Sequence, residues 1–202
     1  MGRETKARPL RHAGCVGTEV NALSGKRALI ALGSNLGDSI SVIREACDRL
    51  QELSDSPIRK SSLWRTTPVD CPPGSPPFVN SAVALVPLSD ETPESLLSKL
   101  QALENKLGRK PKVALNEPRP LDLDLIAFGE EVRNTTELTL PHPRAHLRRF
   151  VLQPLSEIAP DFVLPGEPRT VRELLEALPP DDSTRVSRIP DDAPQSPRRA
   201  HS

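Results

Sequence analysis

Apolar residues along the chain follow two spacings, and these predict most of its regular structure. Short apolar or alternating runs predict strands, whereas apolar residues three or four positions apart predict helices. Strands are expected at residues 27–32, 58–65, 78–86, 121–126 and 137–140, and helices at about 39–53, 92–107, 150–158 and 171–177. The order β-α-β-β-α-β, with an appended strand and helices, predicts an α+β fold, a ferredoxin-like sandwich.

The two ends of the chain lack this patterning. Residues 1–25 and 181–202 have too few apolar side chains to offset the entropy of ordering, so both are expected to be disordered around one domain at 26–180. No apolar run reaches the length of a signal peptide or a membrane span, and acidic Glu4 and Glu19 count against an organellar transit peptide. The sequence therefore predicts a cytoplasmic protein without a membrane partner.

Charge and cysteine content exclude several classes of function. The chain has 27 basic and 27 acidic residues, so no overall charge attracts it to nucleic acid or membrane. Its cysteines, Cys15, Cys47 and Cys71, fit neither an even disulfide framework nor a Cys-x-x-Cys zinc site. We expect a reducing compartment and chemistry that does not use cysteine.

The clearest chemical pattern is the run Pro-Arg-Pro-Leu-Asp-Leu-Asp-Leu-Ile at residues 118–126. Side chains alternate along a strand, so Asp122 and Asp124 lie on one face and the leucines on the other. Two close carboxylates repel each other unless a cation lies between them, and Mg²⁺ often binds one or two carboxylates together with substrate phosphates. Arg119 adds a planar guanidinium suited to phosphate oxygens. The alternative is a half-exposed strand with two solvated acids.

Six ordered motifs between about residues 27 and 165 resemble the 6-hydroxymethyl-7,8-dihydropterin pyrophosphokinase family of folate biosynthesis. They are Gly-Ser-Asn-Leu-Gly-Asp at 33–38, Phe-Val-Asn at 78–80, Arg109, the aspartate run, Leu-Pro-His-Pro-Arg at 140–144, and Arg-Arg-Phe at 148–150. The resemblance implies transfer of the terminal pyrophosphoryl group of ATP to the pterin hydroxymethyl group, with release of AMP.

The same resemblance implies a set of site residues. Asp122 and Asp124 would hold two Mg²⁺ ions, and Arg109 and Arg119 would close on the phosphates. The residues expected near ATP are Gln101, Glu104, Lys112, Asp124, Leu125, Thr139, His142 and Arg148. Those expected near the pterin are Gly33, Ser34, Asn35, Thr66, Val69, Phe78, Asn80, Asp122 and Phe150, with the two phenylalanines on either side of the ring.

Individual residues have simpler interpretations that the sequence leaves open. Phe78 and Phe150 belong to a chain with four Phe, one Trp and no Tyr, and each is either a pterin-stacking ring or a plain core residue. Glu104 interrupts the apolar stripe of its helix, as a bonded buried carboxylate or a site residue would. The run at 33–38 lacks the Gly-Lys-Ser/Thr ending of a Walker phosphate loop, which favours a turn and helix start.

Two departures from the family pattern and two alternative functions complete the analysis. Asn116 and Pro143 stand where some members have aromatic residues, which affects loop closure and adenosine contacts. The alternatives are a metal-dependent nucleotide-sugar transferase and a non-catalytic ferredoxin-like binding module, for example for RNA. The preferred hypothesis is a monomeric enzyme whose partners are ATP and 6-hydroxymethyl-7,8-dihydropterin, without nucleic acid.

Overall fold

One sheet organises the chain, and the computed structural model describes it through residues 27–68, 71–109, 117–179 and 185–191. Its strand order is β5-β1-β4-β3-β8, and β2 pairs with β4 beside β3. The pairings of β1 with β4 and β5, and of β4 with β3, are antiparallel. The strands are β1 (Ala28–Ser34), β2 (Arg59–Lys60), β3 (Trp64–Thr66), β4 (Phe78–Leu85), β5 (Asp122–Phe128) and β8 (Val186–Arg188).

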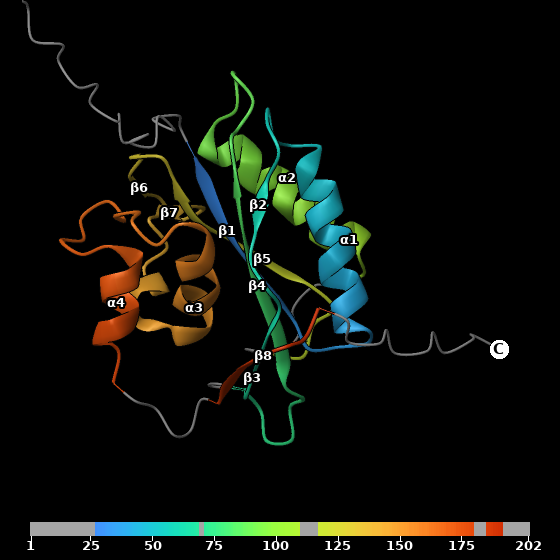
Figure 1. Cartoon of the computed structure of the whole chain (residues 1–202). Helices are drawn as coiled ribbons and strands as arrows, with labels where there is room; N and C mark the ends of the chain where they lie inside the picture. The colour runs from blue at the N-terminus through green and yellow to red at the C-terminus, as the bar shows by residue number, and fades with distance from the viewer. Residues whose placement is uncertain (1–26, 69–70, 110–116, 180–184, 192–202) are drawn as a thin grey trace, which may run out of the picture.

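Helices cover both faces of this sheet, with α1 (Ser39–Gln51) and α2 (Pro93–Lys106) on one and α3 (Arg149–Ile158) and α4 (Val171–Ala177) on the other (Figure 1). Alternate residues of β1 therefore enter two separate apolar clusters: Ile30 packs toward α1 and α2, whereas Leu29 packs toward α3 and α4. This α+β arrangement confirms the predicted ferredoxin-like sandwich. No helix in the described part of the chain is long and apolar enough to cross a membrane.

Local sequence signals explain where the two helices of the first face begin. The Asp38 side chain accepts a hydrogen bond from the backbone N–H of Ser41 at the start of α1, and Thr92 does the same for Ser95 at the start of α2.

Cys47 is buried on the apolar stripe of α1, and burial raises the pKa of its thiol to about 11. The thiol is therefore protonated at neutral pH, in agreement with a structural residue.

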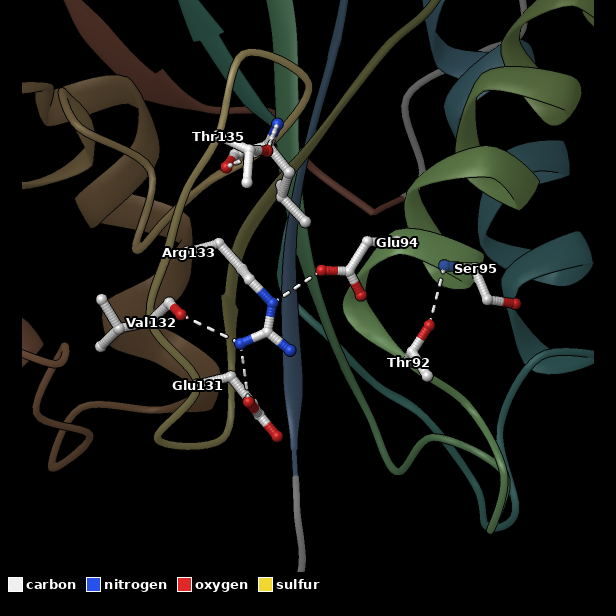
Figure 2. Close-up of polar contacts among 8 residues, drawn as sticks. Thr92, Glu94, Ser95, Glu131, Val132, Arg133 and Thr135 are labelled. Atoms are coloured by element: carbon white, nitrogen blue, oxygen red, sulfur yellow. Dashed lines mark hydrogen bonds and ion pairs between the residues drawn. The ribbon is translucent and has the colours of Figure 1, made fainter.

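A small hairpin outside the main sheet leads into the site. It consists of β6 (Arg133–Asn134) and β7 (Thr139–Leu140), and a 3₁₀ helix (Ala145–Leu147) follows it. Figure 2 shows the Arg133 guanidinium between Glu94 of α2, at 2.6 Å, and Glu131, at 2.9 Å. This ion-pair network joins the hairpin to the start of α2.

The structure differs from the sequence-based expectation at three strands. The strand expected at 58–65 is divided into β2 and β3, and β6 was not predicted. The third difference is β8, which lies in the segment 181–202 that was expected to be disordered. Ile189, just after β8, is only 5% exposed within the core, and burial of this side chain together with pairing to β3 explains the order. The expected disorder of residues 1–25 lies outside the described residues.

Candidate active site

A cleft of about 790 Å³ opens on the face of the sheet that α3 covers, next to the first turn of that helix. It gathers side chains from β1, β4, β5, α2 and the segment between β7 and α3. The predicted site residues that line it are Gly33, Thr66, Phe78, Asn80, Gln101, Glu104, Arg109, Arg119, Asp122, Asp124, His142, Arg148 and Phe150. Residues distant in sequence thus meet in one place.

Strand register creates the floor of this cleft. Gly33 lies directly opposite Asn80 of β4 on one side and Asp122 of β5 on the other, so the three residues form one row on one face of the sheet. A Cβ atom on Gly33 would lie 3.3 Å from the Asn80 Oδ1 atom and 3.8 Å from the Phe78 ring. Glycine at this position therefore leaves open the space between the amide and the carboxylate.

The two residues after Gly33 support the cleft but are not among those that line it. Ser34 and Asn35 are both buried. The Asn35 side-chain oxygen accepts a hydrogen bond from the Arg119 N–H at 2.9 Å, and the Asn35 N–H donates to the Arg119 carbonyl at 3.2 Å. The Asn35 amide also donates to the Pro76 carbonyl at 3.3 Å. Asn35 thus holds the backbone of Arg119 against the end of β1, and its expected role near the pterin stays a prediction.

Both oxygens of Asp122 face guanidinium groups. Arg109 Nη1 lies 3.0 Å from Asp122 Oδ1, and Arg119 Nη1 lies 3.0 Å from Asp122 Oδ2. The two arginines lie ten positions apart, at opposite ends of the segment 109–119, yet they converge on one carboxylate. This arrangement places two guanidinium groups at the edge of the cleft.

Asp124 is in a different environment on the same strand face. Among the described residues, no Lys, Arg or His nitrogen lies within 4.0 Å of its carboxylate oxygens. Burial, followed by the charge of Asp122, raises the pKa of Asp124, whereas His142, Arg148 and Arg119 act in the opposite direction. A carboxylate that is costly to ionise in a buried, electronegative setting is a favourable place for a cation.

Glu104 connects α2 to the edge of the sheet. The helix ends in a Schellman motif, in which Gly108 has φ +96°, the Gly108 N–H donates to the Asn105 carbonyl at 3.2 Å, and the Arg109 N–H donates to the Glu104 carbonyl at 3.0 Å. The Glu104 carboxylate accepts a hydrogen bond from the Leu123 N–H at 2.7 Å and pairs with the Arg109 guanidinium. The buried acid therefore satisfies the free edge of β5 and orients Arg109.

Glu104 should give the protein a specific pH dependence. Burial raises its pKa from 4.5 to about 6, against the opposing effects of the Leu123 N–H and Arg109. The folded state then binds more protons than the unfolded state between pH 4.5 and 6, so the free energy of unfolding falls by about 2 kcal/mol as pH rises through this window. Glu104→Gln cannot titrate and should lack this fall. Urea unfolding of the wild type and of Glu104→Gln at pH 4.5 and 7 measures this fall in the free energy of unfolding. An equal change with pH in the two proteins would contradict the prediction.

The opposite wall of the cleft comes from the segment between β7 and α3. The His142 N–H donates to the Ile126 carbonyl at 2.9 Å, and Nδ1 of its ring accepts from the Arg144 N–H at 3.2 Å, which leaves the ring proton on Nε2. Burial lowers the pKa of His142, which favours the neutral ring, and His142 lines the cleft. The Arg148 guanidinium lies over the Phe150 ring, 5.4 Å from its centroid.

Some predicted residues are not placed in the cleft. Thr139 is exposed on β7, and Leu125 packs in the core on the opposite face from Asp124, so only its backbone is available to a ligand. Val69 and Lys112 lie outside the described residues. A ligand-binding role stays a prediction for these four positions, as it does for the predicted residues that line the cleft.

The cleft also contains residues that the sequence analysis did not select. Thr67 and Cys71 extend the wall begun by Thr66, Asn105 lies one turn after Gln101, and Arg144 follows His142 by two residues. The helical spacing of Gln101 and Asn105 was a usable signal, because residues four apart share a helix face. Thr67 and Cys71 gave no such signal, since their loop has no regular period.

Comparison with known proteins agrees with this geometry. The family described as 7,8-dihydro-6-hydroxymethylpterin-pyrophosphokinase (HPPK) matches residues 29–160. The 2-amino-4-hydroxy-6-hydroxymethyldihydropteridine pyrophosphokinase of Pseudomonas aeruginosa is 38% identical over 76% of this chain and 93% of its own length. The enzyme of the same name from Synechocystis sp. is 38% identical over 75% of each chain.

Solved structures show the same fold. A crystal structure of a triple mutant of Plasmodium falciparum HPPK-DHPS with pteroate aligns with a TM-score of 0.57 and 14% identity, over 75% of this chain and 43% of the other. At this identity the likeness shows the fold alone, and this chain spans less than half of that protein. Because the family match covers well over half of the chain and the curated relatives are 38% identical to it over about three quarters of its length, the chain belongs to the HPPK family.

Proposed function

We propose that this chain transfers the pyrophosphoryl group of ATP to the hydroxymethyl group of 6-hydroxymethyl-7,8-dihydropterin and releases AMP, a step of tetrahydrofolate biosynthesis. The observation that carries the proposal is one cleft with two kinds of wall. Arg109 and Arg119 converge on Asp122 at one side, and the aromatic rings Phe78 and Phe150 line it as well. Charged phosphates and a flat heterocycle are the two ligand types that such walls suit.

The reaction needs positioning and charge neutralisation more than covalent help from the protein. The hydroxymethyl oxygen attacks the β-phosphorus of ATP, the bond from that phosphorus to the oxygen bridging to the α-phosphorus breaks, AMP leaves, and the hydroxyl proton passes to solvent. No side chain in the described cleft is an obvious general base for that proton.

Magnesium fits the carboxylate pair of this chain. Within the described residues no group of three or more His, Cys, Asp or Glu is placed to hold a metal through protein ligands alone. Mg²⁺ commonly binds one or two carboxylates and takes its remaining ligands from substrate phosphates and water. Asp122 and Asp124 would hold two such ions, which neutralise phosphate charge and polarise the attacking hydroxyl when bound.

Arg109 and Arg119 would exchange partners during the reaction. Without phosphates they neutralise Asp122, and with phosphates present they would donate to phosphate oxygens, leaving the Asp122 carboxylate to a cation. Asn35 anchors the Arg119 backbone and Glu104 orients Arg109, so both guanidinium groups start from fixed positions. His142 and Arg148 would add donors from the opposite wall.

The pterin would lie over Gly33, between the two phenylalanine rings. Asn80 is buried in this region, and its side-chain nitrogen donates to the Thr66 hydroxyl at 2.8 Å, so its oxygen faces the space above Gly33. An amide oriented in this way accepts hydrogen bonds from the amino groups of a pterin edge. The balanced charge of the chain gives no overall attraction to nucleic acid, and we propose that the enzyme acts on small molecules as a cytoplasmic monomer.

The direct test is production of AMP from ATP with and without the pterin. Purified full-length protein with Mg²⁺ should release AMP only when hydroxymethyl-dihydropterin is present, in an amount equal to the diphosphorylated pterin. Calorimetry with a non-hydrolysable ATP analogue, added before or after the pterin, reports whether the two sites communicate. ADP as the nucleotide product, or AMP formed without pterin, would overturn the proposal.

The aromatic walls give a prediction specific to the pterin. Phe78→Ala and Phe150→Ala should weaken pterin binding about tenfold and ATP-analogue binding much less, because stacking contributes about 0.5–1.5 kcal/mol beyond burial and is made to the heterocycle. Phe162→Ala is the matched control, since this ring packs against the same cluster as Phe150 but does not line the cleft. Calorimetry and melting temperatures of all three variants separate the effects. A variant that loses stability but keeps pterin affinity would assign its ring to the core.

A further inference from the structure

The segment 185–191 forms the edge of the sheet beside the cleft, beyond the residues 29–160 that the family match covers. β8 pairs antiparallel with β3, with Val186 opposite Thr66 and Arg188 opposite Trp64. Figure 1 shows β8 alongside β3 at the edge of the sheet. Without this segment β3 would be the edge strand, and edge strands are the least constrained part of a sheet.

Reciprocal contacts fasten this segment to a residue of the cleft. The Thr67 N–H donates to the Arg185 carbonyl at 3.3 Å, and the Arg185 N–H donates to the Thr67 hydroxyl at 3.2 Å. Thr67 and Thr66 both line the cleft, and the Thr66 hydroxyl holds the Asn80 amide. The segment therefore contacts the part of the wall that orients Asn80.

The other end of the segment is fixed in the core. Ile189 is 5% exposed within the cluster beneath α1 and α2, and its N–H donates to the Leu63 carbonyl at 2.8 Å. The Arg188 side chain donates to the Ser62 hydroxyl at 2.9 Å, and the Arg44 side chain of α1 donates to the Asp191 carbonyl at 3.2 Å. One buried side chain and several hydrogen bonds thus hold the segment although most of its other residues are exposed.

We propose that residues 185–191 act as a strap that positions Thr66, Thr67 and, through Thr66, Asn80 for the pterin. The strap touches no reacting atom and acts through the wall of the cleft. Its contacts lie at the β3 side of the sheet, away from Arg109, Arg119 and the carboxylates of β5. Loss of the strap should therefore weaken pterin binding and leave ATP binding intact. This inference rests on the proposed function, because it assumes that the Thr66–Asn80 wall binds pterin.

The test compares pterin and nucleotide affinity in strap variants of the full chain. Ile189→Ala removes the buried anchor, and Ile189→Val keeps most of it. Ile158→Ala is the matched control, since Ile158 is 4% exposed at the far end of α3 and does not line the cleft. Two shortened chains complete the set: the chain that ends after residue 184 lacks the strap, and the chain that ends after residue 191 keeps it. Dissociation constants are measured by calorimetry well below each melting temperature.

The strap predicts a selective change. Ile189→Ala and the chain ending at 184 should raise the pterin dissociation constant about tenfold, as expected when a preorganised wall is loosened, with the ATP-analogue constant almost unchanged. Ile189→Val and the chain ending at 191 should bind like the wild type, and Ile158→Ala should lose stability alone. Equal weakening of both ligands, or unchanged pterin affinity in a folded chain ending at 184, would refute the strap. Wild-type protein that fails to bind pterin would instead refute the proposed function.

Discussion

Asp122→Asn and Asp124→Asn should each lower turnover by at least about 10³-fold, because loss of a metal-binding carboxylate removes several kcal/mol of charge stabilisation in the transition state. Both variants should remain folded. Asp124→Asn should melt at or above the wild-type temperature, since burial and Asp122 make its charge costly in the protein without ligands. Initial rates of AMP release at saturating Mg²⁺, together with melting temperatures, provide the measurement.

A matched control excludes a general effect of removing a negative charge. Asp48 lies on α1 with its side chain 78% exposed, so Asp48→Asn should keep wild-type turnover. Near-normal AMP release by either cleft variant would show that the carboxylate pair does not support the reaction. A lower melting temperature without a lower rate would give the pair a purely structural role.

Arg109→Ala and Arg119→Ala should lower kcat by about 10²–10⁴-fold, the range observed for positioned groups that stabilise transition-state charge. The reason is the exchange of partners: each guanidinium is 3.0 Å from Asp122 before ligands bind and would act on the phosphates afterwards. Lysine at position 119 should recover only part of the rate, because a point charge cannot reproduce the planar fork. Steady-state rates and ATP-analogue dissociation constants measure both quantities.

The control for the arginines is Arg172→Ala, which removes an arginine that is 56% exposed on α4 and pairs with Asp161. It should leave kcat unchanged. Weaker nucleotide binding with normal kcat in the cleft variants would make Arg109 and Arg119 simple docking charges. No change in either quantity would show that their convergence on Asp122 has no catalytic role.

The strand with the carboxylates was predictable because its signal is local. Alternation alone placed Leu121, Leu123 and Leu125 in the core and both aspartates on the other face, as the structure confirms for β5. Helix α2 was equally predictable, since Thr92 and Pro93 mark its start and Gly108 its end. A single stretch of sequence contains all the information needed in these cases.

Other elements depend on contacts that a local pattern does not contain. β8 is ordered by pairing with β3, more than a hundred residues earlier, and by the burial of Ile189. The strand expected at 58–65 is interrupted at Ser61, because its hydroxyl accepts the Ala82 N–H at 2.9 Å in place of a backbone carbonyl. Side-chain substitution for a ladder hydrogen bond is not visible in hydrophobic spacing.

The sequence predicted which residues belong to the candidate site better than it predicted how these residues contact one another. The motifs identified most of the residues that line the cleft, but not the bond between Asn35 and Arg119, which are 84 positions apart. The pairing of Glu104 with both Leu123 and Arg109 was also not visible, because it requires the helix end and the sheet edge to meet. Such contacts follow from the packing of α2 beside β5.

The most direct test of pyrophosphoryl transfer follows the β-phosphorus of ATP. Wild-type protein is incubated with Mg²⁺, hydroxymethyl-dihydropterin and ATP labelled with ³²P at the β-position, and the products are separated. The account predicts that the label moves to the pterin product in an amount equal to the AMP formed, and that no transfer occurs without pterin or in the Asp124→Asn variant. Label that remains in the nucleotide as ADP, with only the γ-phosphate transferred, would contradict the account.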